Sequence, residues 1–147
     1  MRKSKINISG FKIGTAENRD GLTGVTVILA PYGGATAGVD VRGCAPGTRE
    51  TDLLDPRKTV QKIHAVVLSG GSAFGLEAAS GCVKYLAEQG VGFPIGNVCV
   101  PIVCSAVLFD LMIGDEKAYP DLLMGYEAAK SASSEFLSGC NGAGTGA

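Results

Sequence analysis

IHAVVLSGGS, residues 63–72, is the stretch of the sequence from which the fold class can be predicted. Its continuous apolar run, 63–68, is typical of a strand that is buried on both faces. The glycines at 70 and 71 end that strand, and Ser72 is a suitable N-cap for a following helix. We predict that this helix is amphipathic, and that Gly90 is its C-terminal glycine. The prediction rests on apolar residues at three- and four-residue spacing, namely Phe74, Leu76, Ala78, Ala79, Cys82, Val83, Leu86 and Ala87. A strand, a glycine-rich turn and a helix in this order predict an α/β fold.

Two further strands are expected before this unit. Residues 24–30 (GVTVILA) are apolar and β-branched, which favours a strand. The turn-forming residues 31–34 (PYGG) separate them from 35–42 (ATAGVDVR), so we predict a β-hairpin. Residues 43–51 follow as a loop.

After the unit, residues 98–111 are apolar and contain Pro101, which indicates extended structure. A second helix is expected to start at Tyr119-Pro120, with one apolar face made by Leu122, Leu123, Tyr126, Ala129 and Ala132. The sequence then ends in a glycine-rich segment, residues 138–147, of the kind that holds a backbone close to another group.

Composition excludes several classes of protein. The chain has 147 residues, of which 22 are glycine and 46% are hydrophobic, so it is expected to form a core rather than to be disordered. A net charge of -1 gives no electrostatic footprint for nucleic acid. No apolar run is long enough to span a membrane, and no apolar segment follows the basic N-terminus as in a signal peptide. We therefore expect a cytoplasmic protein without nucleic acid or membrane partners.

Cysteine and histidine usage argues against a metal site. The five cysteines are irregularly spaced without a C-x-x-C pair, and His64 is the only histidine. We expect reduced thiols without a catalytic role, no metal and no cofactor. His64 is interpreted as a strand residue rather than as a general base.

The turn 69–72 is a candidate anion or oxyanion site. It matches neither the nucleophile elbow G-x-S-x-G, because Phe74 takes the last position, nor the phosphate-binding loop. Free backbone N–H groups and the N-terminus of a helix are nevertheless expected here, and both favour a nearby anion or oxyanion. The alternative is a tight strand-to-helix turn capped by Ser72. Asp110 can equally cap a helix or point into a site.

Four stretches together resemble one family of enzymes. They are residues 38–52, 68–76, 107–111 and 142–147. In this order they are similar to the N-terminal half of the self-processing aminopeptidases of the L-aminopeptidase D-amidase/D-esterase type. That family includes β-peptidyl aminopeptidases and nylon-oligomer hydrolases, and it shares its fold with ornithine acetyltransferase.

The resemblance implies an α/β fold made of a layered sheet sandwich flanked by helices. Residues 1–147 would be a single α/β unit, the incomplete N-terminal part of a larger domain. The precursor would cleave itself and free an N-terminal serine or threonine as nucleophile. In the family that residue lies beyond the glycine-rich segment, so the nucleophile is expected C-terminal to Ala147 and no catalytic residue is expected in this chain. Its partners would be the C-terminal part that bears the nucleophile and a small peptide, amide or ester substrate.

The resemblance also assigns roles to residues of this chain. The substrate and oxyanion region would be built by Ser69, Gly70, Gly71, Ser72, Gly142, Gly144 and Thr145, with Phe109 lining it and Asp110 orienting its neighbours. Some members carry a tyrosine where this chain has Phe109, and a phenyl ring cannot donate a hydrogen bond to an oxyanion.

Three functions stay open at this point. Hydrolysis by an aminopeptidase or amidase is favoured. Acyl transfer of the ornithine acetyltransferase kind uses the same fold, and a non-catalytic truncated fragment that serves in assembly is the third. A homo-oligomer is expected, because an incomplete half would expose apolar surface.

Overall fold

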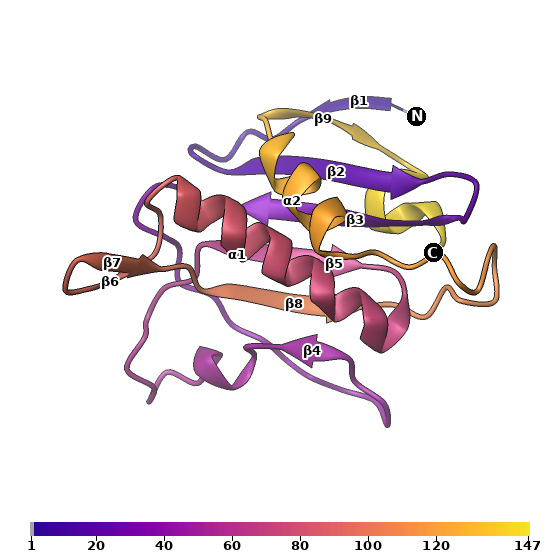
Figure 1. Ribbon diagram of the computed structural model, residues 1–147. Coiled ribbons are helices and arrows are strands. Elements are labelled where there is room, and N and C mark those ends of the chain that lie inside the picture. Colours follow the sequence, from indigo (N-terminus) through magenta and orange to yellow (C-terminus); the bar gives the residue numbers. More distant parts are fainter. Residues whose placement is uncertain (1) are drawn as a thin grey trace.

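The computed structural model describes residues 2–147, which form a mixed five-stranded sheet covered by helices (Figure 1). The strand order is β2-β3-β5-β8-β4. β5 and β8 are parallel, and the other neighbouring pairs are antiparallel. The bounds are β2 Lys12–Asn18, β3 Thr23–Leu29, β4 Thr48–Arg49, β5 Ala65–Ser69 and β8 Val103–Val107. The predicted α/β class is confirmed.

Two helices lie side by side on one face of this sheet, as Figure 1 shows. They are α1, Ala78–Glu88, and α2, Leu122–Lys130. Because side chains alternate along a strand, one set of strand residues faces these helices. That set and the helices form the core, whose buried members are Val25, Val27, Leu29, Ala65, Val67, Ala78, Ala79, Cys82, Leu86, Val103, Ala128 and Ala129.

Glycines allow these layers to approach closely. A Cβ added to Gly125 of α2 would lie 1.9 Å from the carbonyl oxygen of Ala78, and one added to Gly81 of α1 would lie 1.9 Å from that of Leu122. The two helices therefore meet backbone to backbone. Gly14 of β2 is equally tight, since its added Cβ would lie 2.0 Å from the Ala128 oxygen.

Small elements complete the fold. β1 (Arg2–Lys5) pairs with β9 (Glu135–Ser138), and β6 (Phe93–Ile95) forms a hairpin with β7 (Val98–Val100) that projects from one end of the sheet. Three 3₁₀-helices, η1 (Asp52–Leu54), η2 (Ser72–Glu77) and η3 (Gly142–Thr145), lie in the connections and the tail. η3 contacts β2 and β3.

The predicted hairpin of residues 24–30 with 35–42 is wrong. β3 pairs with β2 on one side and with β5 on the other, so neither of its edges is available to 35–42. Of that stretch, only Ala35 forms an isolated bridge, with Ile63. Strand β2, which occupies the place of the expected partner, was missed because polar residues interrupt its apolar pattern.

The start of the first helix also differs from the prediction. Ser72 does not cap it: its own φ is 52°, Gly71 precedes η2, and no side-chain cap bond is present there. Regular α-helix begins only at Ala78. The end was predicted correctly, because Gly90 (φ 65°) donates its N–H to Ala87 O.

The later expectations hold in part. Extended structure in 98–111 is confirmed for β7 and β8 but not for 108–111. The second helix begins at Leu122, slightly later than the predicted start at Tyr119-Pro120. Asp121 caps it, because its carboxylate accepts the N–H of Met124 at 2.8 Å. Its buried residues are Gly125, Ala128 and Ala129, whereas Leu123 is 62% exposed, so the predicted apolar face is only partly correct.

Candidate functional site

The carboxyl ends of the parallel strands β5 and β8 bring two predicted segments together. Leu108 donates its N–H to Ser69 O, and Ser72 donates its N–H to Leu108 O, both at 2.9 Å. Residues 69–72 and 108–110 therefore form one connected turn region. In open α/β sheets, ligands bind at this end of parallel strands.

Asp110 lies at the centre of this region with a side chain that is almost completely buried. One carboxylate oxygen, Oδ1, accepts the N–H of Gly71 at 2.6 Å. The other, Oδ2, accepts the hydroxyl of Thr23 at 2.7 Å. Bonds to an ionised acceptor are stronger than bonds between neutral groups. The Asp110 side chain therefore points inward and holds the Gly70-Gly71 turn against β3, while its role in a functional site stays a prediction.

Glycine is required at two positions around this carboxylate. A Cβ on Gly70 would lie 2.0 Å from Asp110 Oδ2 and 2.4 Å from Thr23 Oγ1. A Cβ on Gly146 would lie 2.7 Å from the same Asp110 oxygen and 2.1 Å from Leu22 O. The glycine-rich tail thus reaches the turn that follows β5, although more than 70 positions separate them in the sequence.

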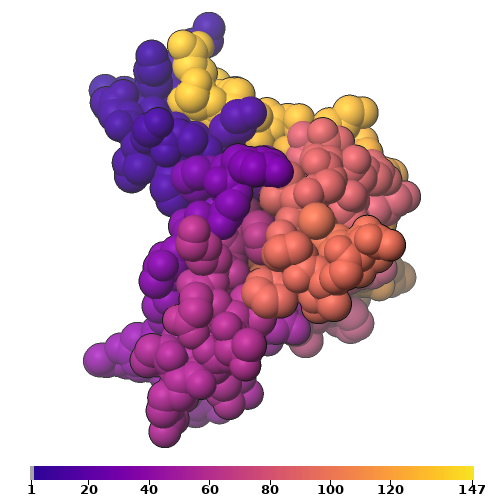
Figure 2. Space-filling model, turned by 90° about the vertical axis from the view of Figure 1, so that its left-hand side faces the viewer, coloured from indigo at the N-terminus to yellow at the C-terminus, as the bar shows by residue number. Residues whose placement is uncertain are grey.

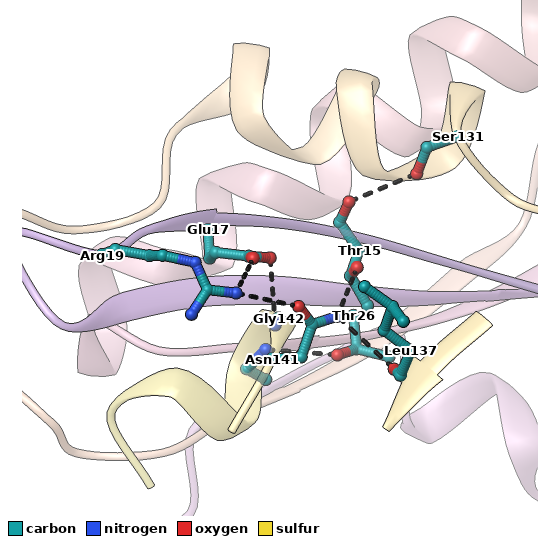
Figure 3. A network of polar contacts seen from close by, with 9 residues as sticks. Thr15, Glu17, Arg19, Thr26, Ser131, Leu137, Asn141 and Gly142 are labelled. Atoms are coloured by element: carbon teal, nitrogen blue, oxygen red, sulfur yellow. Dashed lines mark hydrogen bonds and ion pairs between the residues drawn. The ribbon is translucent and has the colours of Figure 1, made fainter. Parts of the chain in front are cut away.

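A polar network, drawn in Figure 3, holds the beginning of the tail on β2. The amide nitrogen of Asn141 donates to Thr15 Oγ1 at 2.7 Å, and Arg19 Nη2 donates to Asn141 Oδ1 at 3.3 Å. Arg19 also pairs with Glu17 at 2.6 Å, and Glu17 accepts the Gly142 N–H at 3.3 Å. Sequence reasoning missed Thr15 and Glu17 because they belong to strand β2, which it did not predict, and it missed Arg19, which follows directly on that strand.

Gly142 lies directly on β3. A Cβ there would approach Thr26 Oγ1 to 2.4 Å, and the same hydroxyl accepts the Ala143 N–H at 3.1 Å. Gly144 donates to Asn141 O at 3.1 Å. Thr145 Oγ1 is buried and finds no hydrogen-bond partner among residues 2–147.

Ala147, the last residue of the chain, follows directly on this packed segment. Gly146 is buried beside Asp110, whereas Ala147 is exposed. The nucleophile expected C-terminal to Ala147 lies outside the described residues, so that expectation stays a prediction. The position of Ala147 means that a residue joined to it would start next to the Asp110 region.

The backbone N–H groups of the turn are already used within the chain. Gly70 donates to Gly24 O, Gly71 to Asp110, and Ser72 to Leu108 O. The buried hydroxyl of Ser69 donates to Gly70 O at 3.1 Å. The expectation of free N–H donors at this turn is therefore wrong for residues 70–72, and the turn is a rigid support.

Phe109 points away from this network. Its side chain is 63% exposed, whereas its neighbour Asp110 is 3% exposed. Another exposed ring, Phe74 of η2, stacks on Tyr119 with ring centroids 4.6 Å apart. Phe109 is thus free to line a site next to the turn without contributing to its rigidity.

The cysteines show no sign of a catalytic or metal-binding role in the part of the chain that the structure describes. All five cysteines are free thiols, and burial raises the pKa of Cys82 to about 12. Within residues 2–147 no three His, Cys, Asp or Glu side chains cluster in a way that could hold a metal ion. No helix in the same range is long and apolar enough to span a bilayer.

Comparison with known sequences identifies the family of this chain. Residues 5–147, nearly its whole length, match Peptidase family S58. The chain belongs to this family. The predicted family resemblance is confirmed.

Two relatives show how much of an S58 protein this chain represents. It is 47% identical over 121 residues to an uncharacterized aminopeptidase of Mycobacterium tuberculosis, and this matched stretch covers 82% of this chain and 35% of the relative. It is 35% identical over 144 residues to the 6-aminohexanoate-oligomer endohydrolase of Paenarthrobacter ureafaciens, covering 97% and 38%. The chain therefore spans little more than a third of the length of these S58 relatives.

Solved structures share the fold. A Pyrococcus horikoshii protein matches 95% of the chain with a TM-score of 0.75 at 23% identity, covering 43% of that protein. A Burkholderia sp. beta-aminopeptidase matches 95% with a TM-score of 0.68 at 20% identity, covering 41%. An ornithine acetyltransferase from Mycobacterium tuberculosis matches 99% with a TM-score of 0.51 at 15% identity, covering 78%. The predicted aminopeptidase and ornithine acetyltransferase type of fold is confirmed.

Proposed function

We propose that this chain is the N-terminal part of a self-processing hydrolase that cleaves small peptides, amides or esters. The observation that carries the proposal is the junction of the Gly70-Gly71 turn, Asp110 and Gly146 at the carboxyl ends of β5 and β8. Membership of Peptidase family S58 supplies the reaction class. The nucleophile, an N-terminal serine or threonine, would come from a C-terminal part of the protein that follows Ala147.

In this proposal the residues of the junction position the site rather than react. Asp110 is a positioning residue, because its carboxylate is occupied by Gly71 and Thr23. Since the N–H groups of residues 70–72 are used internally, the donors that stabilise a developing oxyanion would come from other groups of the completed site. The walls would be shaped by Ser69, Ser72, Gly142, Gly144 and Thr145, and Phe109 would line the site.

Intact mass spectrometry under denaturing conditions tests the self-processing step. The protein is produced as its gene encodes it and separated without proteases. The expected result is two polypeptides, of which the second begins with serine or threonine. Substitution of that residue by alanine should leave one unprocessed chain. A single species near 15.0 kDa would instead support the non-catalytic assembly partner.

An activity assay separates hydrolysis from acyl transfer. The processed protein is offered p-nitroanilides of α- and β-amino acids, with and without an added amine acceptor. Release of p-nitroaniline at a rate independent of the acceptor supports the hydrolase. A reaction that requires the acceptor, and that yields the acylated amine, supports transfer of the ornithine acetyltransferase kind.

We propose also that the protein is a cytoplasmic homo-oligomer. Support for assembly comes from the exposed apolar residues of the β6–β7 hairpin, where Ile95 is 56% and Val98 is 59% exposed. Light scattering of the processed protein would show a mass that is a multiple of the combined chains. A single copy of the combined chains would contradict the oligomer.

A further inference from the structure

We propose that a second binding site lies at the amino ends of β5 and β8, and that it takes a small carboxylic acid with an apolar body. The site is a cavity of about 470 Å³ between the Tyr32-Gly33 turn, the segment before β5 and the residues that follow α1. Figure 2 faces this end of the molecule, where the segments near residues 32, 60 and 95 come together.

This cavity is separate from the junction around Asp110. His64, which lines it, directly precedes β5, whereas the Gly70-Gly71 turn directly follows that strand. Five residues of extended strand span roughly 16 Å. The two places therefore lie at opposite ends of the same parallel strand pair.

His64 offers a hydrogen bond that the described part of the chain does not use. Its side chain is only 4% exposed, and its Nδ1 accepts the N–H of Ile102 at 3.1 Å. In the neutral ring the proton therefore sits on Nε2. Burial lowers the pKa of His64, which favours the neutral ring. Nε2 has no hydrogen-bond partner among residues 2–147, so it can donate to an acceptor that is bound in the cavity lined by His64.

Charge and shape indicate the class of ligand. Lys62 is the one charged side chain among the described residues that line the cavity. A carboxylate would accept hydrogen bonds from both the Lys62 ammonium and His64 Nε2. The remaining walls include Val91, Phe93 and Pro94, against which an apolar body of modest size would pack.

Calorimetry with matched probes tests the proposal. The protein, produced as its gene encodes it, is titrated with phenylacetate and with phenylacetamide, which has the same shape without the charge. We expect phenylacetate to bind at least about tenfold more tightly. Equal affinity for the two probes, or no binding of phenylacetate up to about 10 mM, would overturn the proposal.

Variants show whether the probe occupies this cavity. Lys62→Met removes the charge and keeps the apolar stem, and should weaken phenylacetate binding about fivefold to tenfold. Lys58→Met is the matched control, because Lys58 belongs to the same loop but does not line the cavity. His64→Asn retains an acceptor for the Ile102 N–H while losing the Nε2 donor, and should also weaken binding. Binding that neither cavity variant weakens belongs to another site and contradicts the proposal.

Cys99 provides an independent readout, since its exposed thiol lies on the cavity wall. Phenylacetate should slow alkylation of Cys99 by iodoacetamide, measured by peptide mapping, and leave that of the exposed Cys44 unchanged. If phenylacetate protected neither Cys99 nor Cys44, or protected both, the assignment of the probe to this cavity would be contradicted. A Cys99 that resists alkylation without any probe would mean that the cavity is closed in the whole protein, which would also overturn it.

Discussion

Asp110 shows how one residue can organise several distant segments. Its carboxylate accepts bonds from the Gly71 backbone and the Thr23 hydroxyl, and Gly146 of the tail packs beside it. A carboxylate that is removed from water is tolerated when hydrogen-bond donors surround it. The cost of its burial is thus offset only while the turn, β3 and the tail keep their places.

The first prediction concerns this carboxylate. Asp110→Asn keeps the size of the side chain but replaces one accepting oxygen with an NH₂ group, which cannot accept from Gly71 or Thr23. We expect a loss of about 1–3 kcal/mol in the free energy of unfolding, measured in urea, and a loss of hydrolase activity. Glu116→Gln, at an exposed position a few residues further along the chain, is the control and should change stability by less than about 0.5 kcal/mol. Equal effects of the two variants would refute the positioning role.

The second prediction concerns Phe109. Because its ring is exposed, Phe109→Tyr adds a hydroxyl without disturbing packing. If the ring lines the active site, this donor should raise kcat for an amino acid p-nitroanilide by a few fold, up to about tenfold. Phe136→Tyr, on β9, should leave kcat unchanged. An unchanged kcat in both variants would remove Phe109 from the site.

A third prediction uses the burial of His64, which lowers the pKa of its imidazole. Below a pH of about 6.5 the unfolded chain takes up this proton while the folded chain does not, so stability falls as the pH decreases. The fall continues until the pH reaches the folded-state pKa. We expect His64→Asn to flatten the dependence between about pH 7.5 and pH 5.5 in urea unfolding. An unchanged slope would mean that His64 titrates normally in the folded protein.

At the scale of elements, the contact between α1 and α2 depends on small residues. Gly81 and Gly125 let the two helix backbones touch, and the remaining space is filled by Ala78, Ala79, Ala128 and Ala129. Apolar periodicity alone predicted larger residues on this face of α2. The close approach explains why Leu123, apolar but too large, lies on the outside.

The fourth prediction tests this contact. Gly125→Ala would place a Cβ 1.9 Å from Ala78 O, so the helices must separate. The gain in helix propensity is about 1 kcal/mol, and overpacking costs more. We expect a net loss of about 1–2 kcal/mol in chemical unfolding followed by circular dichroism. Gly38→Ala, where the added Cβ meets open space, should have little effect. A Gly125→Ala variant that is more stable than the original would contradict the packing.

Over the whole molecule, the described helices cover only one face of the five-stranded sheet. On β5, the helix-facing Val67 is fully buried, while Leu68, which points to the other face, is 39% exposed. On this second face the η3 segment of the tail contacts β2 and β3 and also reaches β5, but it leaves Leu68 partly exposed. Since the chain spans little more than a third of its relatives' length, we expect the rest of the protein to cover the face at Leu68.

The fifth prediction follows from that expectation. In the whole protein, Leu68→Lys would bury a charge and should cost more than about 2 kcal/mol or prevent assembly of the parts. Leu123→Lys, on the exposed side of α2, is the control and should cost less than about 0.5 kcal/mol. Thermal unfolding and light scattering of the purified proteins measure both effects. Similar behaviour of the two variants would mean that the second face stays open to solvent.

The sequence by itself determined the α/β class, the strand–turn–helix unit of residues 63–90, strand β3 and the membership of the family. These features rest on local apolar periodicity and on glycine positions, which are visible over short stretches. Asp110 and the tail were singled out from their motifs, but their mutual contact was not.

Only the tertiary structure decided the partners of β3, the start of the first helix and the junction itself. Strand pairing depends on which edges remain free after all strands have assembled, and the hairpin predicted from adjacent segments was therefore wrong. The N–H groups of residues 70–72 were expected to be free because their acceptors, on Gly24, Asp110 and Leu108, are distant or poorly marked in the sequence. Contacts of this kind arise from the packing of whole layers, and no local pattern encodes them.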